Sequence, residues 1–516
     1  MLRIHPFSTL HRLLPLAICI STLGISIAAE GAEASSSSRS LTNTPKEQVL
    51  FPFDDVAIPF NKGLLMTLVH GKKAVENPVV LPAGKPGEPD YPKAQYYGTV
   101  IRVGDEYRMW YSGVNDSTRC ICYATSTNGL AWEKPKLGLV EFKGSTQNNI
   151  LSLNGTNMLD GAIALVLYEP DDPNPERRFK MLREIGPAEM PAAFSADGLR
   201  WKSAPATPPG AGIIKDSALE ACGLMKFNGC YYVNGHGGTI PHPLKGAGKR
   251  MSVTFISYDF EHWTQAAHLA FRRDPIPPRP PTDFEFHRGE QVHVGASLWN
   301  RGNVVLGFYG QYHNPSNDRR TSTIDIGLIV SSDGLHFTEP VPDFKLIESF
   351  EEADGADARL LQGEGFENIA NQTVYWYSIW ATTPGSPNGV RVATWPRDRF
   401  GYFSAAPYEE HACCISSPFK LETGEGEVRL NVDRLSPECR LRVELLSEQM
   451  VPLPEYSGEN CISVTKTGFS RKVAWKGKNH LENISGSFRI KVSWEGGKPE
   501  EGRLYAIYLQ ENAAHK

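Results

Sequence analysis

The sequence predicts an all-β protein, a five-bladed β-propeller followed by a C-terminal β-sandwich. Three observations support this fold class. A short phrase ending in an aromatic residue recurs along the chain, strand-like runs precede each copy, and the pattern changes after about residue 410. The 516 residues include 47 glycines and 38 prolines, which is typical of many short strands joined by turns.

The recurring phrase is a short strand followed by Ser-x-Asp/Asn-Gly-x-x-aromatic. Four copies are YATSTNGLAW, AAFSADGLRW, TFISYDFEHW and LIVSSDGLHF, and a degenerate fifth is VRVATWPRDRFGYF at 390–403. The Asx-Gly pair favours a tight hairpin turn, because glycine tolerates positive φ. We expect the ring after each turn to pack between neighbouring sheets. These rings are Trp132, Trp201, Trp263, Phe337 and Phe403, at intervals of 69, 62, 74 and 66 residues.

Two further strand-like runs precede each phrase, so that one unit is strand, turn, strand and then the Asx-Gly hairpin. A four-stranded unit repeated radially is a propeller blade, and closing the ring removes long exposed edges. We therefore assign residues 49–408 to five blades. A large β-sandwich or a solenoid is the alternative, although repeats of 62–74 residues are long for a solenoid.

The C-terminal part has a different pattern. The runs FKLETGEGEVRLNV, CRLRVELL and FRIKVSW alternate apolar and polar residues with period two. This alternation predicts an antiparallel sandwich over 409–516. Such a module either binds sugar or braces the propeller, and the sequence leaves both roles open.

The N-terminus has the pattern of an export signal. Arginines flank the start of an uncharged apolar run at 13–27, and small residues follow it, which predicts a signal peptide over 1–34. The run is shorter than the roughly 20 residues of a comfortable membrane span, although an uncleaved anchor is the alternative. Residues 35–48 are Ser-rich and predict a disordered lead-in. We expect a secreted or periplasmic protein with no membrane contact after cleavage.

Charge and motifs exclude several function classes. The formal net charge of −5 argues against a nucleic-acid partner, which requires a basic face. Eight cysteines lie outside the signal; export permits disulfides among them, with the connectivity left open. No cysteine pair has zinc-site spacing with histidines nearby, and no dinucleotide or phosphate-loop motif occurs, so we expect neither a metal nor another cofactor.

Several segments resemble known families. VIRVGDEYRMWYSG followed by ATSTNGLAWEKP resembles the first blade of glycoside hydrolase families 43 and 32, and ALEACGLMKFNGCYYVNGHGG resembles the family 43 segment that carries the general acid. The chain is also similar to a family of secreted proteins of planctomycete-type bacteria. The resemblance covers about residues 50–405. It implies a glycosidase whose substrate is an extracellular poly- or oligosaccharide, cleaved between two carboxyl groups at the propeller's centre.

The resemblance also implies roles for two carboxyl groups. Glu220 opens the inner strand of the third blade and would be the general acid, which requires a raised pKa. Asp160 occupies the equivalent edge of the second blade and would stabilise the transition state and orient the acid. A solvated strand-end Glu and a simple Asp-Gly turn are the structural alternatives.

The first blade departs from the family pattern. Family 43 has Asp-Pro where this chain has Tyr97-Gly98, so the expected base is missing. Asp90, Glu88 or the pair Asp54-Asp55 are candidates to supply it. Tyr97 is alternatively a nucleophile paired with an acid, as in glycosidases that use tyrosine.

Weaker candidates for contact with sugar open the remaining inner strands. They are Glu290, Gln291 and His293 in the fourth blade, Gln362 and Glu364 in the fifth, and His236 at the end of a third-blade strand. Hydrolysis competes with two other functions, a non-catalytic carbohydrate-binding propeller and a surface-assembly scaffold. Two carboxyl groups facing Glu220 would favour the enzyme, and an aromatic-lined pocket with only one acid would favour binding.

Overall fold

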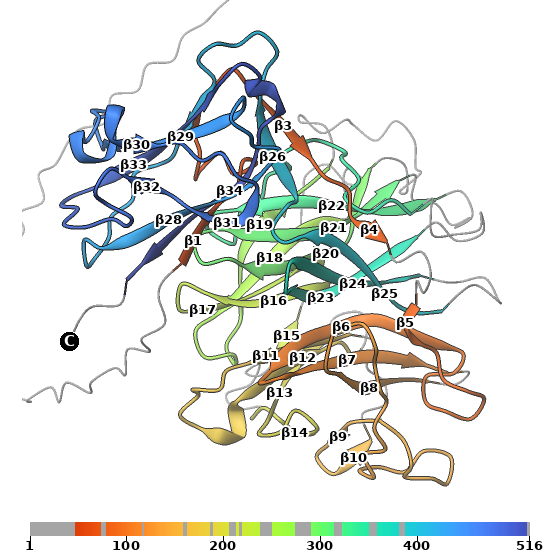
Figure 1. The fold of residues 1–516 in the computed structure, drawn as a ribbon. Coiled ribbons are helices and arrows are strands. Elements are labelled where there is room, and N and C mark those ends of the chain that lie inside the picture. Colours follow the sequence, from red (N-terminus) through yellow and green to blue (C-terminus); the bar gives the residue numbers. More distant parts are fainter. Residues whose placement is uncertain are drawn as a thin grey trace, which may run out of the picture. The chain divides into compact units, whose positions relative to one another are not determined.

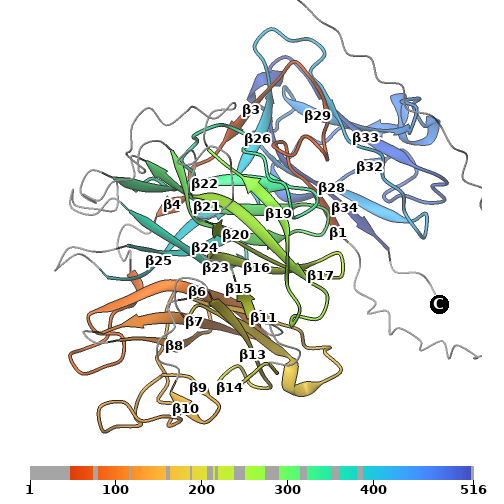
Figure 2. The ribbon, with the colours of Figure 1, turned by 180° about the vertical axis from the view of Figure 1, so that it is seen from behind.

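The structure is a computed structural model that describes residues 47–73, 79–115, 118–157, 163–185, 189–205, 213–215, 219–237, 250–273, 290–313, 322–349, 359–380 and 388–512. These residues are all-β, as predicted, and the helical turns among them are short (Figures 1 and 2). The turns are η1 (Pro175–Arg177), η3 (Pro454–Tyr456), η4 (Gly458–Asn460) and η5 (Pro499–Glu501). Within the described ranges, no helix has the length and hydropathy to cross a membrane. The predicted signal peptide lies outside these ranges.

Five mainly antiparallel groups of strands, here called sheets, form between residues 72 and 396 of the described chain, and a single parallel bridge joins the fifth to the first. The first contains β6 (Lys93–Val103), β7 (Glu106–Val114) and β8 (Arg119–Ser126). The second contains β11 (Ala164–Tyr168), β12 (Phe179–Arg183), β13 (Glu189–Ser195) and β14 (Arg200–Ser203), with β9 (Ser152–Leu153), β10 (Thr156–Asn157) and β15 (Ile213–Lys215) at its edges. The third contains β16 (Glu220–Phe227), β17 (Cys230–Gly237), β18 (Met251–Ser257) and β19 (Thr264–Phe271). The fourth contains β20 (Gln291–Asn300), β21 (Val305–His313) and β22 (Thr323–Ser331), and the fifth β23 (Leu360–Ile369), β24 (Gln372–Ile379) and β25 (Gly389–Pro396).

The first strands of these five sheets contact one another in turn. Contacts join β6 to β11, β11 to β16, β16 to β20 and β20 to β23. The series returns to its start through a parallel bridge between Glu364 of β23 and Thr99 of β6. Two strands that precede β6 in the chain, β4 (Lys72–Lys73) and β5 (Val79–Pro82), pair with β25 of the fifth sheet. Segments from both ends of this region therefore share one sheet.

The recurring phrase forms the same turn in four places. The serine hydroxyl accepts a hydrogen bond from the backbone N–H three residues on, at Ser126, Ser195, Ser257 and Ser331. The Asn or Asp two residues after the serine accepts hydrogen bonds from the N–H groups two and three residues farther along the chain. The turns also join neighbouring sheets, since the indole N–H of Trp110 in β7 donates to Gly198 O at 2.8 Å. Local side-chain capping thus explains why this phrase recurs.

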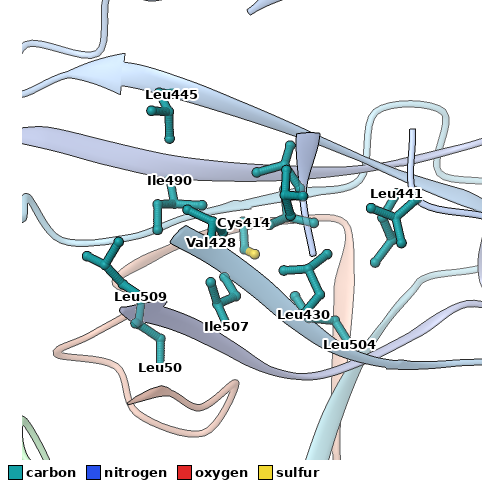
Figure 3. Close-up of a cluster of buried hydrophobic side chains, with 14 of the residues drawn as sticks. Leu50, Cys414, Val428, Leu430, Leu441, Leu445, Ile490, Leu504, Ile507 and Leu509 are labelled. Carbon is teal, nitrogen blue, oxygen red and sulfur yellow. The ribbon is translucent and has the colours of Figure 1, made fainter. Parts of the chain in front are cut away.

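The C-terminal region forms two larger sheets over one apolar core. One sheet contains β28 (Gly426–Asp433), β31 (Gly468–Lys472), β34 (Arg503–Glu511), β26 (Gly401–Ala405), β3 (Leu64–Leu68) and β1 (Glu47–Leu50). The other contains β29 (Arg440–Ser447), β33 (Phe488–Glu495), β27 (Cys413–Ile415) and β2 (Phe60–Lys62), and a separate pair is β30 (Cys461–Ile462) with β32 (Ala474–Trp475). Side chains of both sheets, among them Leu430, Leu445, Ile490 and Ile507, meet in this core (Figure 3).

The composition of these sheets differs from the predicted boundaries. Residues 49–68 were assigned to the propeller region, yet β1, β2 and β3 pair with C-terminal strands. Phe403 was expected to pack between propeller sheets, but it lies on β26 opposite Leu504 in the C-terminal core. The fifth copy lacks the capping serine of the other four, and the chain continues into a strand of the other region.

The eight cysteines outside the signal are all free thiols among the described residues. Cys120 and Cys122 come nearest to each other, with sulfur atoms 3.6 Å apart in the core of the first sheet. The disulfides that export would permit are therefore not formed among the described residues.

Candidate functional site

The candidate site lies at the edge where β6, β11, β16, β20 and β23 begin, here called the starting edge. Glu220 is the first residue of β16 and pairs across the ladder with His236 of β17. Its side chain is 29% exposed, so the carboxyl group reaches solvent. The Tyr97 hydroxyl donates a hydrogen bond to Glu220 Oε1 at 2.9 Å, and His236 Nε2 lies 3.6 Å from Oε2. Three of the residues singled out in the sequence thus meet.

Tyr97 reaches Glu220 because β6 is irregular at this point. The ladder with β7 shifts register between Gln95 and Thr99. A Cβ at Gly98 would lie 1.8 Å from the carbonyl oxygen of Trp110, so only glycine fits beside Tyr97. Burial, followed by the charge of Glu220, raises the pKa of Tyr97 well above its ordinary value. The phenol therefore keeps its proton and acts as a donor to Glu220.

His236 is held as a neutral imidazole. Its Nδ1 accepts a hydrogen bond from the backbone N–H of Val294 at 2.8 Å, which leaves the ring proton on Nε2, facing Glu220. Burial, aided by the charge of Arg250, lowers the pKa of His236 to about 3. The imidazole is therefore a fixed neutral group at neutral pH rather than a counter-ion of Glu220.

A second carboxyl group, Glu184, belongs to this cluster. Glu184 directly follows β12, and its backbone N–H donates to Ile163 O at 3.1 Å, just before β11. Burial and the charge of Glu220 raise the pKa of Glu184 to about 7, although the charge of Arg119 opposes the rise. The sequence pattern alone did not indicate Glu184. The hairpin of β11 and β12 could have indicated it, because the end of β12 lies beside the start of β11 in an antiparallel pair.

Asp160, the predicted partner of Glu220, lies outside the described residues. Asp90 is placed away from Glu220, against the second and third strands of the first sheet. It accepts a hydrogen bond from Tyr111 Oη at 2.8 Å and pairs with Lys134 Nζ at 2.5 Å. Two further candidates for the base close local turns. Glu88 accepts from the Lys85 N–H, and Asp54 Oδ1 accepts from the N–H groups of Val56 and Ala57.

His293 lines the same edge as His236. Its ring lies 6.3 Å from that of His236, 5.0 Å from that of Trp380 and 5.7 Å from that of Tyr312, measured between centroids. Gln291 opens the strand two residues earlier and is buried. The histidine thus joins the Glu220 cluster to an aromatic wall contributed by the fourth and fifth sheets.

Glu364 lies deeper between the first strands. Its Oε2 accepts hydrogen bonds from the N–H groups of Leu298 at 2.9 Å and Leu224 at 3.4 Å. Burial raises the pKa of Glu364 well above its ordinary value. Gln362 similarly donates to the carbonyl oxygens of His293 and Gly295. These two side chains join the third, fourth and fifth sheets where their ladders are irregular.

Glu290 belongs to a separate network on the fourth sheet. Its Oε2 lies 2.7 Å from Arg273 Nη1 and 2.7 Å from His313 Nδ1. His313 Nε2 lies 3.1 Å from Asp325 Oδ2, which also pairs with Lys345 at 3.0 Å. The network contains as many cationic partners as carboxylates, so Glu290 is committed to ion pairs.

The described residues also line hollows elsewhere, and in two of them a carboxylate is paired with lysine side chains. A hollow of about 1130 Å³ in the C-terminal region includes Glu444, and hydrogen bonds from Lys491 and from a backbone N–H outweigh burial and lower its pKa. A second hollow, of about 660 Å³, includes Glu169. Hydrogen bonds from Lys180 and Lys226 outweigh burial there and lower the pKa of Glu169. Neither carboxyl can hold a proton at neutral pH, so the Glu220 cluster remains the best candidate for acid–base chemistry.

Comparisons with known proteins find distant structural similarity. No protein-family model and no curated protein matches the sequence. Similar solved structures include a protein of glycoside hydrolase family 130, the mannoside phosphorylases. That family is described as containing glycoside hydrolases that target β-1,2 mannosidic linkages in Candida mannan. The protein is 13% identical to this chain, the match covers 64% of this chain and 95% of that chain, and the TM-score is 0.41. A glycosyl hydrolase from Bacteroides ovatus is 15% identical over 64% and 95%, with a TM-score of 0.40. A thermostable family-43 glycoside hydrolase is 15% identical over 63% and 91%, with a TM-score of 0.37. At these values the similarity does not by itself assign an activity to this chain.

Proposed function

We propose that this protein is a secreted glycoside hydrolase that acts on an extracellular poly- or oligosaccharide. In this proposal the five sheets between residues 72 and 396 are the blades of a five-bladed propeller, and the two C-terminal sheets are a β-sandwich. The cyclic contacts of the five first strands support the propeller. One apolar core shared by the two C-terminal sheets supports the sandwich. The apolar run at 13–27 supports export.

The observation that carries the proposal is the pair Glu184 and Glu220. A glycosidase needs one protonated and one ionised carboxyl group on either side of the scissile bond. The pKa of Glu184, raised to about 7 by burial and by the charge of Glu220, leaves it substantially protonated near neutral pH. Glu220 accepts the Tyr97 hydrogen bond, as expected of an ionised carboxylate. The two environments thus separate the two roles.

The mechanism follows from these protonation states. Glu184 donates its proton to the glycosidic oxygen while the bond from that oxygen to the anomeric carbon breaks. The Glu220 carboxylate either takes a proton from the attacking water or attacks the anomeric carbon itself. Tyr97 and His236 hold Glu220 in place from two sides. The family resemblance implied that Glu220 is the general acid. In this proposal Glu184 is the general acid instead.

The experiment is a carbohydrate panel with detection of released reducing sugar. The wild-type protein is compared with Glu220→Gln and with Glu106→Gln, a surface variant at the opposite edge of the first sheet. We expect wild-type cleavage of at least one glycan and a loss of about 10²–10⁴-fold in Glu220→Gln. The melting temperature should be retained, and Glu106→Gln should match the wild type. Full activity in Glu220→Gln would contradict the assignment, and binding without cleavage would favour the non-catalytic carbohydrate-binding propeller.

A second comparison identifies the acid. An aryl glycoside with a nitrophenolate leaving group needs no proton from the enzyme, because the leaving group is already a weak base. Glu184→Gln should therefore lose activity on the natural linkage while keeping much of its activity on the aryl glycoside. Equal losses on both substrates would show that Glu184 is not the acid.

A further inference from the structure

Arg250 lies at the starting edge, immediately before β18. The next residue but one, Ser252, pairs with His236 in the ladder. The Arg250 guanidinium carbon lies 5.3 Å from the centre of the Tyr312 ring. Its Nη1 atom is buried and has no hydrogen-bond partner, and no carboxylate of the described residues forms an ion pair with it. Arg250 therefore presents an uncompensated positive charge beside the Glu220 cluster.

Arg273 differs from Arg250 in having carboxylate partners. Arg273, at the same edge of the same region, is 1% exposed and pairs with Glu290 at 2.7 Å and with Asp343 at 2.5 Å. A buried N–H group without an acceptor, as at Arg250 Nη1, has a desolvation cost, and arginine's planar donors match the two oxygens of a carboxylate. An oxyanion from outside the chain would remove that cost at Arg250.

Ring contacts connect Arg250 to the carboxyl pair. Tyr312, which lies under the guanidinium, packs against His293, and His293 lies between Tyr312, Trp380 and His236. His236 in turn lies 3.6 Å from Glu220. The charge of Arg250 is also one cause of the low pKa of His236, after burial. A ligand bound at Arg250 would therefore share this surface with the carboxyl groups.

We infer that Arg250 forms an oxyanion subsite of the proposed active site, and that the substrate is an acidic saccharide carrying a carboxylate near the cleaved bond. This inference rests on the proposed function. The aromatic rings beside Arg250 supply apolar surface for the faces of a sugar, while its guanidinium neutralises the carboxylate. A positive group is also needed near Glu220, because the negative charges of an acidic sugar and of Glu220 would otherwise repel each other.

The test is binding by calorimetry in the full-length Glu220→Gln protein, which separates binding from cleavage. The probes are oligosaccharides of galacturonate, glucuronate and mannuronate, each compared with its methyl ester, which is the same sugar without the charge. Inorganic phosphate is titrated separately, since it is the other source of an oxyanion. Each titration is repeated after Arg250→Gln, Arg250→Lys and the control Arg102→Gln, a half-exposed arginine at the far end of β6.

We expect at least one acid to bind, with affinity about ten- to a hundredfold lower after Arg250→Gln, a change typical of one charge-assisted interaction. Its methyl ester should be insensitive to Arg250→Gln, Arg250→Lys should restore part of the loss, and Arg102→Gln should change nothing. Binding of no acid, equal loss for acid and ester, or Arg250-dependent binding of phosphate alone would overturn the inference. Acid binding without cleavage by the wild type would instead overturn the proposed hydrolase and leave the subsite standing.

Discussion

Two clusters at the starting edge contain the same kinds of residue but have opposite electrostatics. In the first, His236 faces Glu220, and burial lowers the pKa of the imidazole to about 3. In the second, His313 lies between Glu290 and Asp325; burial opposes its charge, but the bonds to both carboxylates outweigh burial and raise its pKa. One imidazole is therefore neutral at neutral pH, whereas the other holds its proton more tightly than an ordinary histidine does.

The difference comes from the number of charged partners. Lys345 and Arg273 complete the second cluster, so every carboxylate there has a cation within hydrogen-bonding distance. In the first cluster Glu220 has a phenol and a neutral imidazole, and the nearby Glu184 keeps a raised pKa. Carboxylates that each pair with a cation stabilise the fold, whereas carboxyl groups without a cationic partner can release and take up protons. Residue type alone does not distinguish the two.

The largest effect is expected from breaking the second cluster. Asp325 is 1% exposed, and its bonds from His313, Ser349 and Lys345 outweigh burial and lower its pKa. Asp325→Asn removes the counter-ion of Lys345 and one of the two carboxylates that pair with His313, which should reduce the free energy of unfolding at pH 7 by about 3–5 kcal/mol. Urea unfolding measures this loss. The control Asp105→Asn, an exposed carboxylate that pairs with the half-exposed Arg102, should stay within about 0.5 kcal/mol of the wild type.

The sign of the pH dependence follows from the same shift. Because the folded pKa of Asp325 lies below its unfolded value, the stability it contributes is present above about pH 4 and is lost as the pH falls through the folded pKa. The Asp325→Asn variant should therefore lose less stability on acidification than the wild type. Parallel pH profiles for the two proteins would show that this carboxylate does not hold the second cluster.

The sequence predicted the first cluster only in part, and the missing members have a common physical reason. Glu220 and Tyr97 were found because both occur near the start of a recognisable first strand, where the sheets converge. Glu184 was missed because it follows a second strand, and its raised pKa depends on a neighbour that is distant in sequence. Asp90 was close to Tyr97 in sequence, but its side chain pairs with Lys134 instead. Such pairings depend on packing between sheets, which no local pattern encodes.

The fold shows the same division. The four regular copies of the phrase form the predicted turn because serine and Asx side chains cap it locally. The fifth copy lacks that cap, and Phe403 continues into a strand that pairs with β3 and β34. Period-two alternation over 426–433 correctly marked β28 as a strand, but no pattern indicated that residues 47–68 join the same sheets.

The next effect concerns the proton held by the first cluster. If Glu184 is the acid, the rate should fall above about pH 7, because deprotonation removes the donated proton. From pH 7 to pH 9 we expect kcat/KM on an unactivated glycan to fall by about fiftyfold, because Glu184 is about half protonated at pH 7 and only about 1% protonated at pH 9. A profile that stays flat up to pH 9, with the protein still folded, would contradict this role for Glu184.

The smallest effect concerns the phenol that holds Glu220. Tyr97→Phe removes the 2.9 Å hydrogen bond to Glu220 while keeping the buried ring in the core. Loss of one such bond should lower kcat/KM by about fivefold, since a hydrogen bond contributes about 1 kcal/mol. Steady-state kinetics measures the loss, and urea unfolding should show a change in stability of only about 1 kcal/mol.

A matched variant separates the site from ordinary packing. Tyr111→Phe removes a bond of nearly equal length, 2.8 Å, from a buried tyrosine to Asp90, which pairs with Lys134. Because both variants delete one hydroxyl facing one carboxylate, their effects on stability should be similar. Only Tyr97→Phe should slow catalysis, since only Glu220 faces substrate in the proposed mechanism. Equal slowing by both variants would contradict the proposed role of Tyr97. It would mean either that both tyrosines affect catalysis through the packing of the first sheet, or that Asp90 is the catalytic base that family 43 places in an Asp-Pro pair.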